Sequence, residues 1–155
     1  MMKSTIKMNT PIGDLWLSAD GDFLIAISTV YPNLPILESE ILICAKAQLN
    51  EYFNGQRKIF NLATKADACP FTKSVWQALC EIPYGKTATY SEIASKIGKP
   101  NAARAVGRAN HVNPLMIIVP CHRVIGKNGS LTGYAGGIDI KQALINIEAK
   151  NMNTL

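Results

Sequence analysis

The sequence predicts an α+β protein, in which an α/β N-terminal domain with a small antiparallel β-sheet precedes a mainly helical C-terminal domain with a helix-turn-helix. Short apolar runs separated by tight-turn signals fill residues 3–28, which is typical of a β-meander. After residue 66, apolar residues recur at helical spacing. At 155 residues, with 48% hydrophobic and 17% charged side chains, the chain can bury a core. We therefore place two domains at 1–65 and 66–155.

The N-terminal domain is predicted to be a β-meander followed by one helix. The three strands span residues 3–8, 15–19 and 23–28. A turn with Pro and Gly at 10–13 separates the first two strands, and Asp-Gly-Asp at 20–22 separates the last two. The helix is expected over 36–53, where an Asn-Gly pair follows it. The short run 59–62 is a candidate for one further strand.

The C-terminal domain is predicted to begin with three helices. The first spans 71–82, where apolar residues recur on one face. Residues 89–92, with the sequence TYSE, form a capping box that opens a short helix ending at Gly98. A further helix is expected over 100–110. These last two helices make a helix-turn-helix candidate at about 89–111.

The rest of the C-terminal domain is predicted to be a strand, a glycine-rich loop and a last helix. The apolar run 115–119 is expected to form a buried strand that ends at the motif PCHRV, residues 120–124. Five glycines occur in 126–137, where an Asn-Gly pair indicates a hairpin tip. The last helix spans 138–150.

Basic residues concentrate in the second half of the chain. The net charge is +5; residues 1–65 carry six basic and six acidic side chains, whereas residues 66–155 carry ten and five. Within 84–130, seven basic residues stand against one acidic residue. Such a density indicates a polyanionic partner. On charge alone, a merely soluble basic face explains it equally well.

One face of the predicted helix at 100–110 carries the most informative charges. Arg104, Arg108 and His111 recur at i, i+4 and i+7, so they form one basic stripe. Gly107 lies beside the stripe, and a glycine inside a helix indicates the close approach of another backbone. The stripe strengthens the helix-turn-helix interpretation, and a solvated helix face is the alternative.

Cysteine usage and the apolar runs bear on the cellular compartment. The four cysteines are Cys44, Cys69, Cys80 and Cys121. They form no C-x-x-C pair and only His111 and His122 could join them, so we expect neither a metal site nor a disulfide. No run of 18 apolar residues occurs, and the first residues do not resemble a secretory signal. A cytoplasmic protein without membrane contact is expected.

Cys121 is the candidate nucleophile. It follows the predicted strand and Pro120, and its neighbours His122 and Arg123 carry groups that stabilise a thiolate. Because adjacent side chains of an extended segment point to opposite faces, His122 is expected to reach Cys121 through a turn or a bridging water. The alternative is a cysteine that serves as a small buried hydrophobe.

The last predicted helix offers a third partner for this site. Glu148 and Lys141 both fall inside its apolar arc, and a buried carboxylate needs a partner because an unpaired one is expensive. If Glu148 orients His122, a relay from glutamate through histidine to cysteine is complete. A salt bridge of Glu148 to Lys141 or to an arginine is the alternative.

Three strings of residues carry a resemblance to a known family. They are PCHRVIG, which GYAGG and a helix ending in glutamate follow, and, before it in the chain, YGKTATYSEIA and AARAVGRANHVNP. In this order they are similar to the O6-alkylguanine-DNA alkyltransferases, also called methylated-DNA–protein-cysteine methyltransferases. The resemblance is close over 71–148. In the N-terminal half it is loose, and is confined to the TPIG turn and the helix that ends at Asn-Gly.

The resemblance implies a role for each residue of the reaction site. It implies that Cys121 is the alkyl acceptor, that His122 is its water-mediated base and that Glu148 orients His122. Asn113 would be the hinge side chain that holds the helix-turn-helix against the active-site turn. Tyr90 would push on the neighbouring phosphate and donate a hydrogen bond to the departing guanine.

The resemblance also implies how damaged DNA is bound. Arg104 would intrude into the duplex where the damaged base leaves the stack, since an alkylated base cannot be reached inside it. The expected DNA-binding side chains are Arg104, Arg108, His111, Arg123 and Tyr90. The expected base pocket is lined by Tyr134, Ala135, Gly136 and Val124. Some relatives have a serine at the position of Ala135 that donates to the guanine oxygen, which puts this hydrogen bond in doubt here.

The expected function is DNA repair by direct reversal of damage. The alkyl group of O6-alkylguanine, with O4-alkylthymine as a further candidate, would pass irreversibly to Cys121 once per molecule. The partner would be double-stranded DNA, bound in the minor groove by a monomer with little sequence preference. No cofactor is expected. The alternatives are a non-catalytic lesion binder on the same fold, a Cys–His hydrolase, and a helix-turn-helix regulator.

Overall fold

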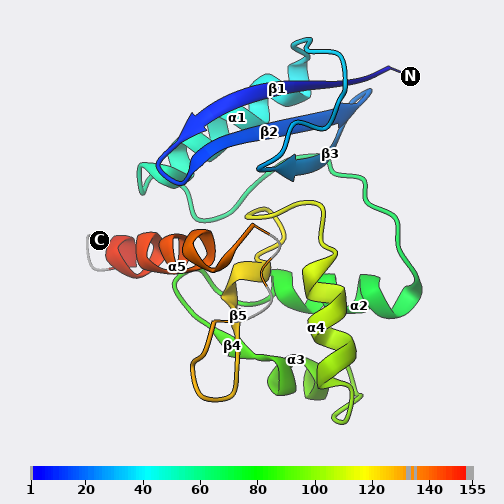
Figure 1. Cartoon of the computed structure of the whole chain (residues 1–155), viewed down its shortest axis with the longest axis vertical. Helices are drawn as coiled ribbons and strands as arrows, with labels where there is room; N and C mark the ends of the chain where they lie inside the picture. The colour runs from blue at the N-terminus through cyan, green and yellow to red at the C-terminus, as the bar shows by residue number, and fades with distance from the viewer. Residues whose placement is uncertain (1, 132–133, 135, 153–155) are drawn as a thin grey trace. The chain divides into compact units, whose positions relative to one another are not determined.

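The chain divides into two units, Met1–Ala66 and Asp67–Leu155, and each has its own set of helices and strands (Figure 1). The predicted domains meet at residues 65 and 66, one residue from this division. The computed structural model describes residues 2–131, 134 and 136–152. The small antiparallel sheet and the helices confirm the predicted α+β class. In the described part of the chain, no helix has the length and apolar character needed to cross a bilayer.

The first unit is a three-stranded antiparallel sheet with one helix packed on it (Figure 1). Its elements are β1 (Lys3–Thr10), β2 (Gly13–Asp20), β3 (Phe23–Ser28) and α1 (Glu40–Phe53). The two strand connections are tight because Gly13 and Gly21 adopt positive φ angles of 104° and 60°, which glycine accepts without strain. The fully buried side chains between sheet and helix include Leu15, Leu17, Leu24, Leu42, Leu49 and Tyr52.

The helix of the first unit begins four residues later than predicted. The residues before it pair with the edge of β1: Thr5 donates its N–H to Pro35 O at 2.9 Å, and Leu37 donates to Thr5 O at 3.2 Å. Backbone groups that bond to a strand edge are not available to a helix, so the expectation of a helix from residue 36 is wrong.

The predicted strand over 59–62 is not formed either. The side-chain amide of Gln48 donates to Asn61 O and accepts from Asn61 N, both at 2.9 Å. One side chain therefore satisfies the backbone groups that a strand partner would otherwise take. The nearest pairing is a single bridge between Leu24 and Thr64.

In its described residues, the second unit contains four α-helices, a short 3-10 helix and one pair of two-residue strands. Its elements are α2 (Pro70–Cys80), β4 (Ala88–Thr89), α3 (Tyr90–Lys96), α4 (Ala103–His111), η1 (Cys121–Arg123), β5 (Val124–Ile125) and α5 (Ile138–Met152). β4 and β5 run parallel to each other. The predicted capping box is confirmed, because the Thr89 side chain accepts from Glu92 N and the Glu92 side chain accepts from Thr89 N. α3 and α4 pack together as the two helices of the predicted helix-turn-helix.

The apolar run before Cys121 is a tight turn, and the prediction of a strand over 115–119 is wrong. Val119 donates its N–H back to Leu115 O at 2.9 Å, and Ile117 takes a positive φ of 74°. The Asn113 side chain holds both ends of the turn: its amide donates to Val119 O at 2.9 Å, and its carbonyl accepts from Leu115 N at 3.0 Å. Apolar content predicts burial here, but local hydrogen bonds decide the backbone path.

Candidate active site

Cys121 is buried in the first position of η1, directly after the turn that Asn113 holds. Its exposed fraction is 4%, and its N–H donates to Val119 O at 2.7 Å. The Asn110 side chain, on the inner side of α4, donates to the Cys121 carbonyl at 3.3 Å. The sequence analysis missed this link between the second helix of the helix-turn-helix and the nucleophile, and the only available signal was a polar residue on the buried side of α4.

The surroundings of the Cys121 thiol act on its pKa in opposite directions. Burial raises the pKa above its ordinary value. The nearby polar groups of Asn113 and Tyr134 and the positive charge of Lys141 lower it, but by less. Because the net effect is a raised pKa, Cys121 is a protonated thiol, and it needs a base to become a nucleophile.

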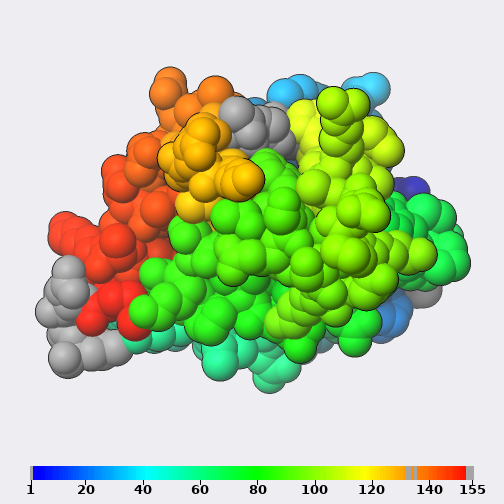
Figure 2. Space-filling model, turned by 90° about the horizontal axis from the view of Figure 1, so that it is seen from below, coloured from blue at the N-terminus to red at the C-terminus, as the bar shows by residue number. Residues whose placement is uncertain are grey.

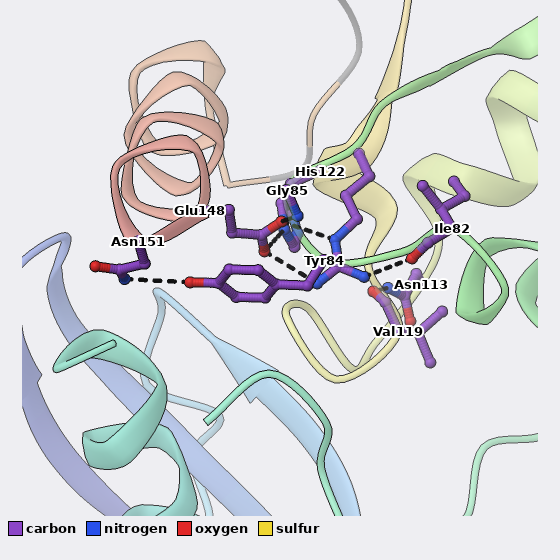
Figure 3. Close-up of polar contacts among 9 residues, drawn as sticks. Ile82, Tyr84, Gly85, Asn113, Val119, His122, Glu148 and Asn151 are labelled. Carbon is purple, nitrogen blue, oxygen red and sulfur yellow. Dashed lines mark hydrogen bonds and ion pairs between the residues drawn. The ribbon is translucent and has the colours of Figure 1, made fainter. Parts of the chain in front are cut away.

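His122 lies beside the nucleophile and is fully buried. Its Nε2 forms a 2.6 Å hydrogen bond with Glu148 Oε2, from α5 (Figure 3). No atom of the described residues forms a hydrogen bond with its other ring nitrogen, Nδ1. Burial lowers the pKa of His122 and outweighs the opposing effect of Glu148, so the ring is neutral. The proton then sits on Nε2, and Nδ1 carries a lone pair.

The residues that donate hydrogen bonds to Glu148 include His122, Arg123 and Gly85. Besides His122, Arg123 donates from Nε to Oε1 at 2.8 Å and from Nη2 to Oε2 at 3.1 Å. The Gly85 N–H donates to Oε1 at 3.1 Å (Figure 3). Burial alone raises the pKa of Glu148, but the hydrogen bonds from His122 and Arg123, together with the positive charge of Arg123, outweigh it and bring the pKa to about 2. The contact of Glu148 with His122 and its salt bridge to an arginine, which the sequence left as alternatives, are both present.

Arg123 is an interior residue, and this position argues against the expected contact with DNA. Its exposed fraction is 6%, and its third nitrogen, Nη1, donates to Ile82 O at 2.7 Å. Its guanidinium also stands 5.7 Å from the centre of the Tyr84 ring. With every nitrogen committed inside the fold, the side chain offers nothing to a phosphate at the surface.

Lys141 is a buried cation between two tyrosines that were assigned to the site. Its side chain is fully buried, and its Nζ lies 5.8 Å from the ring centre of Tyr90 and 5.9 Å from that of Tyr134. Burial lowers the pKa of Lys141, while the nearby Cys121 raises it by less. Sequence reasoning considered Lys141 only as a partner for Glu148. The position of Lys141 in the apolar arc of the last helix was the signal that this charge is buried near the site.

The residues assigned to the base pocket are described only in part. Tyr134 is 7% exposed, and its hydroxyl has no hydrogen-bond partner among the described residues. Val124 is fully buried in β5, where it pairs with Ala88. Gly136 lies against the Tyr134 ring. Ala135 falls outside the described residues.

The basic stripe lies on the exposed side of α4. Figure 2 shows the surface that α3 and α4 form, in green and yellow-green. Arg104, Arg108 and His111 are all exposed there. They border a hollow of about 670 Å³, which is lined by Tyr90, Ala103, Arg104, Gly107, Arg108, His111 and Val112.

Gly107 has a different neighbour from the one expected. A methyl group at this position would lie 3.8 Å from the Tyr90 ring, at ordinary contact distance. Within the described residues it is therefore a side chain, and not another backbone, that approaches Gly107. The ring of Tyr90 thus has α4 on one side and the charge of Lys141 near it.

Two family profiles match the chain, one for each unit. The ribonuclease-like domain of 6-O-methylguanine DNA methyltransferase matches residues 2–66, and the DNA binding domain of the same family matches residues 70–150.

Curated relatives match over nearly the whole chain. A methylated-DNA–protein-cysteine methyltransferase of Methanosarcina acetivorans is 47% identical over 146 residues, which cover 90% of this chain and 94% of the relative. The constitutive methylated-DNA–protein-cysteine methyltransferase of Bacillus subtilis is 45% identical over 150 residues, covering 90% and 91%.

Solved structures agree with these matches. The crystal structure of the Mycobacterium tuberculosis O6-methylguanine methyltransferase superposes with a TM-score of 0.89 at 42% identity, over 97% of this chain and 94% of that one. A Mycobacterium tuberculosis OGT in complex with DNA gives the same TM-score and identity over 96% and 94%. The chain therefore belongs to the methylated-DNA–protein-cysteine methyltransferases, a family of DNA-repair enzymes.

Proposed function

We propose that Cys121 accepts the alkyl group of O6-alkylguanine in double-stranded DNA and keeps it, so that each molecule acts once. The observation that carries this proposal is the state of His122. Its Nε2 is bound to the ionised Glu148, its buried Nδ1 is left with a lone pair, and the ring belongs to the residue that directly follows Cys121 in η1. A base oriented by a carboxylate next to a thiol is the arrangement that nucleophilic catalysis requires.

The reaction follows from these groups. His122 Nδ1 takes the thiol proton of Cys121 through a bridging water, and Glu148 stabilises the resulting imidazolium. The thiolate attacks the alkyl carbon, the S–C bond forms, and the bond between that carbon and guanine O6 breaks with its electron pair on guanine. The Tyr90 hydroxyl donates a hydrogen bond to the departing guanine, which takes up a proton from water, and the His122 imidazolium returns its own proton to water. No cofactor enters these steps, and the thioether that results resists hydrolysis, so the protein is consumed.

Access to the base requires that it leave the DNA stack. Rotating a base out of a duplex costs a few kcal/mol, and a side chain that fills the gap offsets part of this cost. Arg104 is exposed at the start of α4, beside the hollow that Tyr90 and α4 line, and is our candidate for that side chain. Contacts of Arg108 and His111 with phosphates carry no sequence information, which suits a protein that must repair lesions in any context.

The mode of docking is part of the same proposal. α4 carries the exposed basic side chains, and a relative of this chain has been crystallised with DNA. We place α4 in the minor groove, with one protein molecule at each lesion. Lys141 stands between Tyr90 and Tyr134, where its charge favours the thiolate during attack.

The test is incubation with duplex DNA that carries a labelled methyl group on guanine O6. We expect label to move onto the protein at a limit of one methyl per molecule, with Cys121 as the labelled residue in a peptide map. A non-catalytic lesion binder or a helix-turn-helix regulator would bind this DNA without acquiring label. A hydrolase would release the label into solution and continue to turn over.

A further inference from the structure

All three nitrogens of the buried Arg123 side chain donate hydrogen bonds inside the fold, and the reaction as proposed does not use this residue. It reaches Glu148 through two nitrogens, at 2.8 and 3.1 Å, and Ile82 O through the third, at 2.7 Å. Ile82 and Arg123 are 41 residues apart in sequence, so the guanidinium joins the segment that follows α2 to α5. The planar guanidinium presents two parallel N–H groups to the two oxygens of a carboxylate, which the single ammonium group of lysine cannot do.

We propose that Arg123 is a positioning residue, whose guanidinium fixes the Glu148 carboxylate and offsets its charge so that His122 stays neutral and keeps its Nδ1 lone pair for the Cys121 thiol. This inference rests on the proposed function, because it assigns a task within the same relay. Two geometric facts support it. Arg123 occupies both Glu148 oxygens, and the Gly85 N–H adds a further contact to Oε1, so the carboxylate has one orientation toward His122.

The electrostatic part of the proposal follows from what surrounds His122. A buried carboxylate without compensation draws a proton onto a histidine in contact with it, which would occupy the base before the reaction starts. Arg123 and Lys141 both act against protonation of His122, whereas Glu148 favours it. The ionisable groups near this cluster are Cys121 beside His122, Lys141 and Glu148 on α5, Cys80 on α2, and Tyr84 and Tyr134 from the connecting segments.

Gly85 shows how little freedom the carboxylate has. Its φ of +78° disfavours any side chain, and a Cβ there would lie 2.4 Å from the Met152 Cγ of α5. The N–H that meets Glu148 is therefore held by a backbone conformation that glycine permits. The backbone restrains one oxygen of Glu148, and Arg123 restrains both.

The experiment measures the protonation of His122 directly and then the rate of transfer. The chain has only two histidines, so NMR of labelled imidazole nitrogens resolves His122 from His111 across a pH titration. In Arg123→Gln, the loss of a positive charge next to the pair is expected to raise the His122 midpoint by about one pH unit or more. The rate of single-turnover transfer from the free base O6-benzylguanine should begin to fall at a pH that is higher by the same amount. At high pH the rate should be largely recovered.

Two further variants separate the effect of the positive charge from that of the hydrogen-bond geometry. Arg123→Lys keeps the charge but loses the paired hydrogen bonds to Glu148. The pH midpoint of His122 should therefore stay near that of the unmodified protein, while the transfer rate at high pH falls. Arg57→Gln removes a charge paired with Glu51 in the first unit and should leave both curves unchanged. If Arg123→Gln does not fold, Arg123→Lys still decides, because a midpoint raised by one unit or more with the charge retained contradicts the proposal.

The outcomes for Arg123 and for the proposed function are distinct. An unchanged His122 midpoint in Arg123→Gln, or a rate lowered by the same factor at every pH, would overturn the positioning role. Failure of the unmodified protein to accept any alkyl group would instead overturn the proposed function. In that case the NMR titration would still report whether Arg123 keeps His122 neutral.

Discussion

Two groups of basic side chains in the second unit have opposite surroundings. The exposed stripe consists of Arg104, Arg108 and His111 on α4, at the surface. The buried cluster consists of His122, Arg123 and Lys141, which lie in the interior around Glu148 and Cys121. Both groups lie in the basic half of the chain, and nothing in the residue types separates them.

The difference between the stripe and the cluster lies in what holds each charge. Hydrogen bonds to Glu148 and to a backbone carbonyl hold Arg123 as part of the folded state. An exposed arginine contributes little to the stability of the fold, and its charge becomes important only when a ligand binds. Substitutions in the cluster should therefore cost chemistry and stability together, whereas substitutions in the stripe should cost only the handling of DNA.

The largest effect is expected at the thiol that the cluster serves. Cys121→Ser should abolish alkyl transfer, because a serine hydroxyl is a far weaker nucleophile than a thiolate. Binding to duplex DNA should be nearly unchanged, since the side chain is buried and the new one has a similar size. Labelled methyl transfer and a binding titration measure the two properties. Undiminished transfer that maps to Cys44, Cys69 or Cys80 contradicts the assignment.

The next largest effect is expected at Glu148. Glu148→Gln leaves Arg123 without its counter-charge and weakens the orientation of His122, so single-turnover transfer should slow by roughly 100-fold or more. Breaking a buried pair in this way should also lower the free energy of unfolding by about 3–5 kcal/mol. Asp139→Asn, at the exposed start of the same helix, is the matched control and should change transfer less than about twofold. An unchanged rate at neutral pH would make Glu148 merely structural.

Acid titration of stability checks the same carboxylate independently. The folded-state pKa of Glu148 is about 2 instead of 4.5, so the ionised group stabilises the fold above pH 4.5. That contribution is lost as the pH falls from 4.5 toward 2. Urea denaturation at several pH values should show a steeper loss of stability in the unmodified protein than in Glu148→Gln. Parallel curves would mean that the ion pair contributes nothing to folding.

A smaller and more selective effect is expected at Arg104, in the exposed stripe. Arg104→Ala should slow repair of duplex DNA by about 10–100-fold, because the wedge offsets part of the few kcal/mol that base rotation costs. The rate with free O6-benzylguanine should change little, since a free base needs no rotation. The measurement is a pair of single-turnover rates at fixed salt and saturating DNA. Equal losses on both substrates would move Arg104 from DNA handling to support of the fold.

The smallest effect is expected at Arg108, one turn further along the stripe. Arg108→Ala should weaken binding alike for all DNA sequences and reduce the dependence of log K on log salt by about one unit. Duplex repair at saturating DNA should stay near that of the unmodified protein. A loss at saturation that lower salt does not restore would place Arg108 with Arg104 in base rotation.

Local patterns in the sequence were sufficient for much of the fold. The turns at Gly13 and Gly21, the capping box at Thr89 and the helix spacing after residue 66 depend on backbone preferences within a few residues of one another. The predicted start of α1 and the two extra strands failed for a complementary reason. Each depended on which group forms the hydrogen bonds of the local backbone. Thr5 forms them before α1, Gln48 forms them at residue 61, and Asn113 forms them in the turn before Cys121.

The site divides in the same way. The sequence by itself determined which residue types stand together in PCHRV, that a helix presents a basic stripe, and that Glu148 and Lys141 fall in an apolar arc. Only the tertiary structure decided that Arg123 points inward and that Lys141 stands between two tyrosines. The partners of Glu148 include Gly85, 63 residues away in sequence. Periodicity shows which face of a helix is buried, but packing between distant segments selects the group that a buried charge meets.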